Sequence, residues 1–265
     1  MAAKVSSNQF CISLAADQHG LTLIELMIAM VIATIVMAAA LSAFFSMQST
    51  SRVIDQRSGM ALNGRNAMYV IEENIRLMGF NPEGDMNPGK IVKKARSWYL
   101  RFARNDLKNL SEEESVYICL GRADDRDENG IADNGASGLV IKRTRAADDI
   151  AALRFAYAFD RDEDGAVEQA GNEVIWSVDS NDNGELNARL VDSDGDGKLD
   201  NFVHDVGVSV DKIRAVKVWL LARSRHPAGR SSGNRSFWVG GVKYRPNDGH
   251  AYMLFSTAFR CRNMF

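Results

Sequence analysis

The stretch Leu21–Met47, LTLIELMIAMVIATIVMAAALSAFFSM, decides the fold of this chain. Nearly all of it is apolar, with Thr22 and Glu25 among the exceptions. About twenty apolar residues span a bilayer as a helix, so this run of about 27 is long enough. A secretory signal peptide has a shorter apolar core, roughly 7–15 residues, followed by a small-residue cleavage site. The run therefore predicts a membrane-spanning helix, and Ala38–Ala40 keeps a signal peptide as the alternative.

Glu25 is the unusual residue of this apolar run. A carboxylate inside a spanning helix costs roughly 2.5–3.5 kcal/mol on insertion scales, so it needs a partner or a function. The alternative is that Glu25 lies among the lipid headgroups, because it is close to the start of the run. Its position alone leaves both explanations open.

The segment Gly20–Leu26, GLTLIEL, resembles the leader junction of type IV prepilins and type II secretion pseudopilins. In that family a glycine and usually a phenylalanine precede Thr-Leu-Ile-Glu. The resemblance implies that residues 1–20 are a leader, which prepilin peptidase removes by cutting after Gly20, and that Leu21 is then methylated. It also implies that Glu25 pairs with the terminal amine of a neighbouring subunit during assembly. Leu21 in place of phenylalanine and a weakly basic leader depart from the usual pattern.

Residues 48–79 are expected to continue the helix beyond the membrane-spanning half, residues 21–47. A helix from Leu21 to Met78 would be about 87 Å long, and Gly59 and Gly64 are candidate bends. Gly79 and Pro82 predict its end. We expect its apolar stripe to cover a sheet of the same chain, and a coiled coil with another protein is the alternative. The stripe has steps of three and four residues and comprises Ala61, Gly64, Met68, Ile71, Ile75 and Met78.

Residues 80–265 are expected to form a globular head rich in strands. One long helix followed by strands predicts an α+β fold, with the helix packed on an antiparallel β-sheet. The two C-terminal strands, within residues 213–224 and 253–263, resemble the end of PilW-like minor pilins, which have an LLARS-like strand and an FST…RN ending. The predicted strands are Trp98–Ala103, Ser115–Leu120, Gly138–Arg143, Ile150–Phe159, Val174–Val178, Lys212–Ala222 and Ala251–Arg262.

Residues 121–205 form an acidic region within the head. They contain 21 of the 34 Asp and Glu residues and nine Lys or Arg, so their net charge is −12. This charge argues against binding to a nucleic-acid backbone. Such a region is often a solvated face or a disordered segment. Here the acids recur at fixed spacing, which needs another explanation.

The pattern D-x-[DN]-x-[DN]-G-x-Φ-[DEN], where Φ is apolar, occurs four times in this region. Calcium takes six to eight oxygen ligands, and the first nine positions of an EF-hand loop supply them from positions 1, 3, 5, 7 and 9 around a glycine at position 6. The candidate side-chain ligands are Asp125, Asp127, Asn129 and Asp133 in loop 1; Asp160, Asp162, Asp164 and Glu168 in loop 2; Asp179, Asn181, Asn183 and Asn187 in loop 3; and Asp192, Asp194, Asp196 and Asp200 in loop 4.

The four loops depart from an EF-hand at position 12, which lacks the bidentate glutamate. Flanking helices are not evident either, so calcium turns that join strands are expected. Turns rich in Asp, Asn and Gly that bind no metal are the alternative. Position 12 is occupied by Ala136, Gly171, Leu190 and Val203, and the candidate remote ligands two residues further on are Glu173, Asp192 and Asp205.

Three cysteines are present, and Cys11 falls in the predicted leader. Cys119 and Cys261 would remain in the mature chain. They can form one disulfide if the head lies outside the cytoplasm, or they can be two unpaired buried thiols. The sequence leaves these two possibilities open.

A structural role follows from these patterns. Nucleophile-elbow, HExxH and phosphate-loop motifs are not found, so an enzyme is not expected. We predict a minor pilin of a type IV pilus, involved in pilus assembly and stabilised by calcium. A minor pseudopilin of type II secretion and a pilus-displayed, calcium-dependent adhesion module are the alternatives. The predicted partners are other pilin subunits, prepilin peptidase and the inner membrane, with neither nucleic acid nor a small-molecule substrate. The head would lie in the periplasm or outside the cell.

Overall fold

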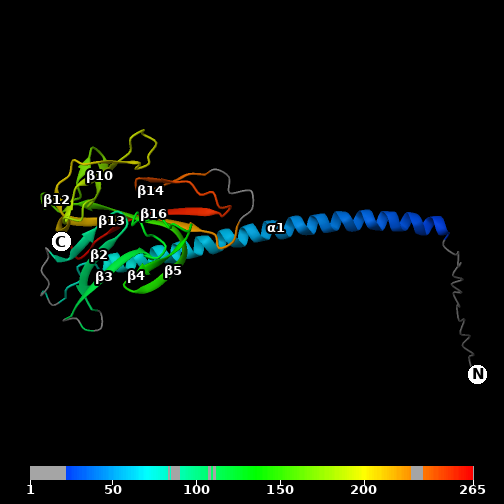
Figure 1. Ribbon diagram of the computed structural model, residues 1–265, viewed down its shortest axis with the longest axis horizontal. Helices are drawn as coiled ribbons and strands as arrows, with labels where there is room; N and C mark the ends of the chain where they lie inside the picture. Colours follow the sequence, from blue (N-terminus) through cyan, green and yellow to red (C-terminus); the bar gives the residue numbers. More distant parts are fainter. Residues whose placement is uncertain are drawn as a thin grey trace, which may run out of the picture. The chain divides into compact units, whose positions relative to one another are not determined.

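The computed structural model describes residues 22–82, 84, 90–106, 109, 112–227 and 235–264 (Figure 1). The chain divides into two units, residues 1–51 and residues 52–265. The predicted cleavage and methylation positions, Gly20 and Leu21, lie outside the described residues, as does Cys11.

Helix α1, Leu23–Arg76, contributes to both units. In the first unit its apolar side chains are exposed, as Leu23, Ile35 and Phe45 illustrate. An 18-residue window of the helix has a mean hydropathy of 2.5 and no buried residue. The helix is therefore long and apolar enough to cross a membrane.

The part of α1 in the second unit buries one face. Gly64, Met68, Ile71 and Ile75 are buried, as the stripe predicts, and Met78 is buried just after the helix. Met60 is buried while Ala61 is only half-buried, so the stripe begins one residue earlier than predicted. The helix is unbroken at both candidate bends. Its end is two residues earlier than expected.

The helix end is fixed by contacts from two other segments. The Asn263 side-chain amide donates to the Arg76 carbonyl at 2.9 Å. The Gly79 amide donates to the Ala103 carbonyl at 3.2 Å, and Gly79 has a φ of +73°. A left-handed residue just after a helix is the usual stop signal, and glycine adopts it without steric cost.

Ten strands form the main sheet, and its pairings are antiparallel. The order β1-β2-β3-β4-β5-β8-β10-β11 forms one path, while β13 pairs with β5 and β16 pairs with β13. Figure 1 shows this sheet with the second part of α1 lying against it. The strands are β1 Val92–Ala95, β2 Leu100–Asn105, β3 Glu113–Leu120, β4 Ser137–Ile141, β5 Thr144–Phe159, β8 Trp176–Val178, β10 Ala188–Val191, β11 Asn201–Val203, β13 Ile213–Arg223 and β16 Tyr252–Arg260.

Small elements complete the second unit. They are three two-stranded sheets and a short 3-10 helix, η2. The pairs are β6 Gln169–Ala170 with β7 Glu173–Val174, β9 Glu185–Leu186 with β12 Val208–Ser209, and β14 Phe237–Val239 with β15 Val242–Tyr244; η2 spans Val210–Lys212.

Strand β5 is the centre of the sheet. It pairs with β13 along Ile150–Phe159, and Tyr157 pairs with β8 on its other edge. Phe155 and Tyr157 are completely buried, and the Tyr157 hydroxyl donates to the Arg96 carbonyl at 3.0 Å. The buried hydrophobic residues of the described chain begin at Met60, so the core lies in the second unit. The α+β fold predicted from the sequence is confirmed.

Candidate functional site

The start of α1 is stabilised by a capping box between Thr22 and Glu25. The Glu25 carboxylate accepts a hydrogen bond from the Thr22 backbone amide at 2.9 Å and another from the Thr22 hydroxyl at 2.9 Å. The Glu25 amide donates in return to the Thr22 hydroxyl oxygen at 3.3 Å. These reciprocal bonds satisfy backbone donors that a helix start leaves open. Glu25 therefore has a local partner in the described chain, at the start of the exposed apolar half of α1.

The four acidic loops fold in the same way. In each, the carboxylate at position 1 accepts hydrogen bonds from the amides of positions 5 and 6, and the side-chain oxygen at position 5 accepts one from the amide of position 7. The side-chain oxygen at position 9 accepts from the amide of position 2. The bonds at position 1 are 3.1 Å for Asp125, 3.1–3.2 Å for Asp160, 3.0–3.2 Å for Asp179 and 2.6–3.2 Å for Asp192.

Left-handed residues explain why the loops share this path. Position 6 is a glycine with φ between +81° and +86° in all four loops. Position 4 is also left-handed, and is Glu128, Glu163, Asp182 or Gly195. Two sharp turns two residues apart bend each loop, and in loops 2 and 4 the side chains of positions 1, 3 and 5 converge. The glycine at position 6 is thus a conformational requirement, as the sequence predicted.

The loops join or follow strands, and no α-helix flanks them in the described part of the chain; the short 3-10 helix η2 is hydrogen-bonded to loops 2 and 3. Loop 1 lies between β3 and β4, loop 2 follows β5, loop 3 connects β8 to β10, and loop 4 connects β10 to β11. The apolar residue at position 8 packs on the core: Ala132 and Leu186 are buried, while Val167 and Leu199 are half-buried against it. The prediction of turns between strands is confirmed.

Two loops bring three carboxylates together. One oxygen from each of Asp160, Asp162 and Asp164 lies within 4.8 Å of the others, and Asp192, Asp194 and Asp196 form the same arrangement. Oxygens bound to one calcium ion at about 2.4 Å are at most about 4.8 Å apart. The donor set is therefore of the right chemistry and spacing for calcium in loops 2 and 4. In loop 1 the Asn129 amide contacts the Asp127 carboxylate at 2.6 Å.

Basic side chains lie beside the loops. Lys198 contacts the Asp196 carboxylate, and Lys212 contacts Glu163. In loop 1 the Arg154 guanidinium donates to the Asn129 carbonyl at 2.7 Å. Arg154 and Lys198 are already counted in the net charge of −12 for residues 121–205, and Lys212 offsets part of it from outside that region.

Asp125 is the most perturbed carboxyl of the four loops. Burial raises its pKa to about 6, because desolvation outweighs the hydrogen bonds from the Asn129 and Gly130 amides. Only 5% of the residue is exposed. Asp192 is different, because four backbone amides donate to it and hold its pKa below the usual range despite some desolvation.

The remote ligand candidates have other contacts. Asp205 pairs with Arg189 at 2.6 Å. Asp192 accepts the amides of its own loop 4, so it is a candidate ligand there rather than for loop 3. Glu173 lies in β7, where it pairs with Ala170. The structure does not assign any of the three to the loop for which the sequence proposed it.

The disulfide that the sequence left open is not formed in the structure. Cys119 and Cys261 are both free and buried, so the alternative of two unpaired thiols holds. Cys119 lies in β3 and Cys261 follows β16, with β4, β5 and β13 between these strands in the pairing order. Neighbouring strands are about 4.8 Å apart, whereas a disulfide needs Cα atoms within about 7 Å. Burial raises the pKa of Cys119 to about 11 and that of Cys261 to about 12.

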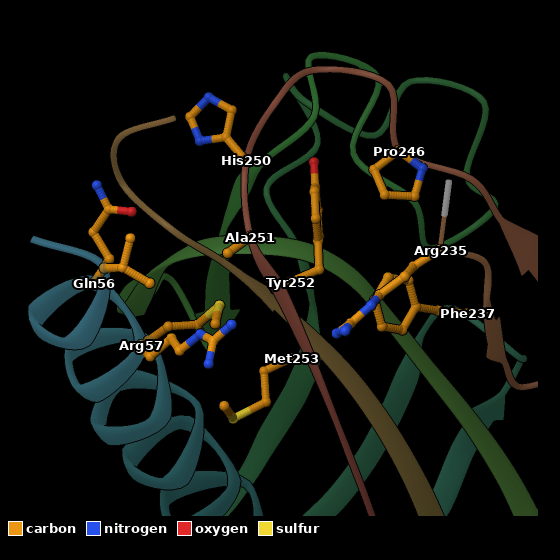
Figure 2. A pocket seen from close by; sticks show the side chains of 11 residues that line it. Gln56, Arg57, Arg235, Phe237, Pro246, His250, Ala251, Tyr252 and Met253 are labelled. Carbon is orange, nitrogen blue, oxygen red and sulfur yellow. The ribbon is translucent and has the colours of Figure 1, made fainter. Parts of the chain in front are cut away.

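A separate pocket of about 310 Å³ is lined by α1 and by residues 235–253 (Figure 2). Met60 and Met253 give it apolar walls, while Arg57 and Arg235 point into it. None of its lining residues belongs to the four loops. The sequence analysis did not identify it, because its walls come from segments that are about 180 residues apart.

Comparisons with known proteins bear on both ends of the chain. A model of the prokaryotic N-terminal methylation motif matches residues 16–41, and a model of type IV pilus-assembly protein W matches residues 131–263. A solved type IV-like pilin from Thermus thermophilus is similar at 13% identity and a TM-score of 0.36, over 80% of this chain and 98% of that chain. No curated protein matches.

The second model covers half of this chain, and its match includes loops 2, 3 and 4 and both C-terminal strands. The N-terminal match covers the first part of the apolar helix α1. The chain therefore belongs to the family of type IV pilus-assembly protein W, and it has the N-terminal motif of a prepilin.

Proposed function

We propose that this chain is a minor pilin, a structural subunit of a type IV pilus that works in pilus assembly. The observation that carries the proposal is the combination of a prepilin motif with a pilus-assembly domain in one chain. The exposed apolar half of α1 supports it, because such a helix can be held by a bilayer and later by other subunits. The family match favours a pilus over a type II secretion system. The role is structural, and we assign no catalytic residue.

Processing would follow from the motif. Prepilin peptidase would cut after Gly20, and Leu21 would become the methylated first residue of the mature chain. Thr22 would then be the second residue, and its amide already donates to the Glu25 carboxylate. That carboxylate is therefore held at the helix start, where the terminal amine of a neighbouring subunit could pair with it. Before assembly the subunit would reside in the inner membrane. After assembly it would be part of the pilus, with its head in the periplasm or outside the cell.

Calcium would stabilise the head. The loops supply oxygen donors, and in two of them three carboxylates are close enough to share one ion. Bound calcium would neutralise carboxylates that now repel each other, and so hold the turn after β5 and the turn between β10 and β11 in place. We propose Asp160, Asp162 and Asp164 in loop 2 and Asp192, Asp194 and Asp196 in loop 4 as the first sites to fill. Loops 1 and 3 have fewer carboxylates and would bind more weakly.

Glu25 allows a test of the assembly role. The variant Glu25→Gln keeps an oxygen that can accept the Thr22 amide but loses the charge that an amine would pair with. Pili would be counted by electron microscopy, and the chain would be followed in membrane fractions by immunoblot. We expect normal insertion and few pili in this variant and in Glu25→Ala. Thr22→Ala, which removes the hydroxyl but keeps the carboxylate, is the control and should assemble. Normal piliation in both Glu25 variants would rule out the assembly role.

A further inference from the structure

A small pocket of about 220 Å³ lies between loop 1, loop 3 and the turn that connects β1 to β2. Six of its eight lining residues are charged, and the other two are Trp98 and Tyr99. Most ligand pockets are lined mainly by apolar side chains. This lining instead favours a strongly polar ligand with at least one flat face.

The walls of this charged pocket are fixed by backbone contacts. The Phe155 amide of β5 donates to the Ser97 carbonyl at 2.7 Å, which holds the β1–β2 turn against the central strand. The Asp179 amide at the start of loop 3 donates to the Ala95 carbonyl at 3.0 Å. The pocket is thus formed without a ligand, and a preformed pocket has less conformational entropy to lose on binding.

Positive charge exceeds negative charge in the pocket by two. Asp182 is already shared, because Lys94 contacts it at 2.5 Å and Arg96 at 3.3 Å. The Asp182 carboxylate is therefore occupied by Lys94 and Arg96, and it forms no ion pair with Arg101 or Arg122. The four cations are Lys94, Arg96, Arg101 and Arg122, and the two carboxylates are Glu128 and Asp182.

Arg101 and Arg122 provide the free donors. The Arg101 Nε donates to the Ser115 hydroxyl at 2.9 Å, which orients the guanidinium while its two terminal nitrogens make no further hydrogen bond to the described chain. Arg122 makes neither a hydrogen bond nor an ion pair with any described residue. A guanidinium binds a carboxylate through two parallel N–H donors. These two side chains therefore fit one anionic group.

The aromatic residues provide the flat face. The rings of Trp98 and Tyr99 have centroids 5.3 Å apart, and Tyr99 stacks on Tyr117 at 6.1 Å and 15°. We propose that this pocket binds a sugar that carries one carboxylate, such as a uronate unit that stands between neutral sugars in a polysaccharide. The rings of Trp98 and Tyr99 are tilted by 53°, and the Arg96 guanidinium lies over the Trp98 ring, 5.8 Å from its centroid. The sugar ring lies against these two aromatic side chains, its carboxylate meets Arg101 and Arg122, and its hydroxyls bond to the remaining charged groups. This inference goes beyond the structural role and does not depend on pilus assembly.

Nucleic acid would also offer an anion and a flat ring, but the surroundings disfavour it. Residues 121–205, which include loops 1 and 3, have a net charge of −12. A polymer with a phosphate on every unit would be repelled by that charge outside the small basic pocket. A glycan in which neutral sugars separate the uronate units places one carboxylate in the pocket and avoids most of this repulsion.

The probes are a trimer with one galacturonate between two neutral galactose units, neutral galactose, and a short thymidine oligonucleotide. Each would be titrated into the purified full chain in detergent micelles, with excess calcium and separately with chelator, and followed by calorimetry and tryptophan fluorescence. We expect the trimer to bind and galactose to bind at least about tenfold more weakly, because a charge-assisted pair contributes about 1.5–3 kcal/mol. Arg122→Gln should weaken trimer binding by about tenfold. Arg143→Gln, an exposed arginine outside the pocket, should change it less than about twofold.

Three results would overturn this inference. They are equal affinity for galactose and the trimer, trimer binding that Arg122→Gln leaves unchanged, and oligonucleotide binding that displaces the trimer at lower concentration. Trp98→Phe keeps a flat ring and should bind nearly as the parent does, whereas Trp98→Ala should not. Failure here would leave the minor-pilin proposal intact, because pilus counts in Glu25 variants test that separately.

Discussion

The Phe255 ring of β16 occupies the space that a side chain at Gly64 would need. A Cβ atom at Gly64 would lie 2.1 Å from the Phe255 Cε2 atom. Real Cβ contacts are never that short, so α1 and β16 can approach this closely only because position 64 has no side chain. This contact belongs to the second unit, residues 52–265, which contains the buried core.

Gly64→Ala should destabilise the head. The added methyl group forces either the helix or Phe255 to move, and such overpacking typically costs about 1–3 kcal/mol. Gly59 is the matched control in the same helix, because nothing lies within 4 Å of its Cβ position. Gly59→Ala should raise stability by up to about 1 kcal/mol through helix propensity. Urea unfolding of a 52–265 fragment measures both. Equal effects of the two variants would mean that the Phe255 contact does not limit position 64.

The sequence predicted much of this architecture because its signals were local. The apolar run after Leu21 predicted the helix, and the strongly apolar strands β13 and β16 were found within two residues of their bounds. The end of β5 was predicted at Phe159, but the strand begins six residues before the predicted Ile150. The expected strand Val174–Val178 was split into β7 and β8. Strands β10 and β11 were missed because they are four and three residues long and stand between the acidic loops. These two short strands form because β10 pairs with β8 and with β11, and such pairing between strands cannot be read from the sequence.

The candidate sites were predictable to different degrees. Each acidic loop was visible as a spacing of Asp, Asn and Gly, because the ligands and the turn lie within nine residues. The charged pocket was invisible, since Lys94, Arg122 and Asp182 come together only through the order of strands and loops. The sequence left the disulfide undecided for the same reason. Three strands, β4, β5 and β13, lie between β3, which contains Cys119, and β16, which Cys261 follows, and this order is not visible in the sequence.

Calcium should raise the thermal stability of the 52–265 fragment. An ion that binds only the folded state stabilises it by about 2.7 kcal/mol when its concentration is a hundred times its Kd. Replacing both Asp160 and Asp192 by Asn should abolish most of the rise in Tm. Asp148→Asn, an exposed carboxyl outside the loops, should leave it unchanged. Identical melting with calcium and with chelator in the parent fragment would make the four loops plain turns.

Asp125 should make the metal-free head less stable as the pH rises. Its pKa in the folded state is about 6, above its value of 3.8 before burial, so the folded chain binds more protons than the unfolded chain between about pH 4 and pH 6. The free energy of unfolding must then fall across this window. Asp125→Asn cannot titrate and should lack this contribution. Urea unfolding at pH 4, 5, 6 and 7 with chelator, compared between parent and variant, measures the difference. A parent that gained stability relative to the variant over the window would contradict the burial effect.

The two thiols of the 52–265 fragment should not react with a thiol reagent in the folded state and should react after unfolding. Cys119 is 5% exposed and Cys261 is fully buried, and burial raises the pKa values to about 11 and about 12. Thiolate, the reactive form, is therefore scarce at neutral pH as well as shielded. A thiol reagent should detect none in buffer and two per chain in strong denaturant, without any reductant. Finding none in denaturant until a reductant is added would mean that the disulfide forms, and the strand order between β3 and β16 would then have to be wrong.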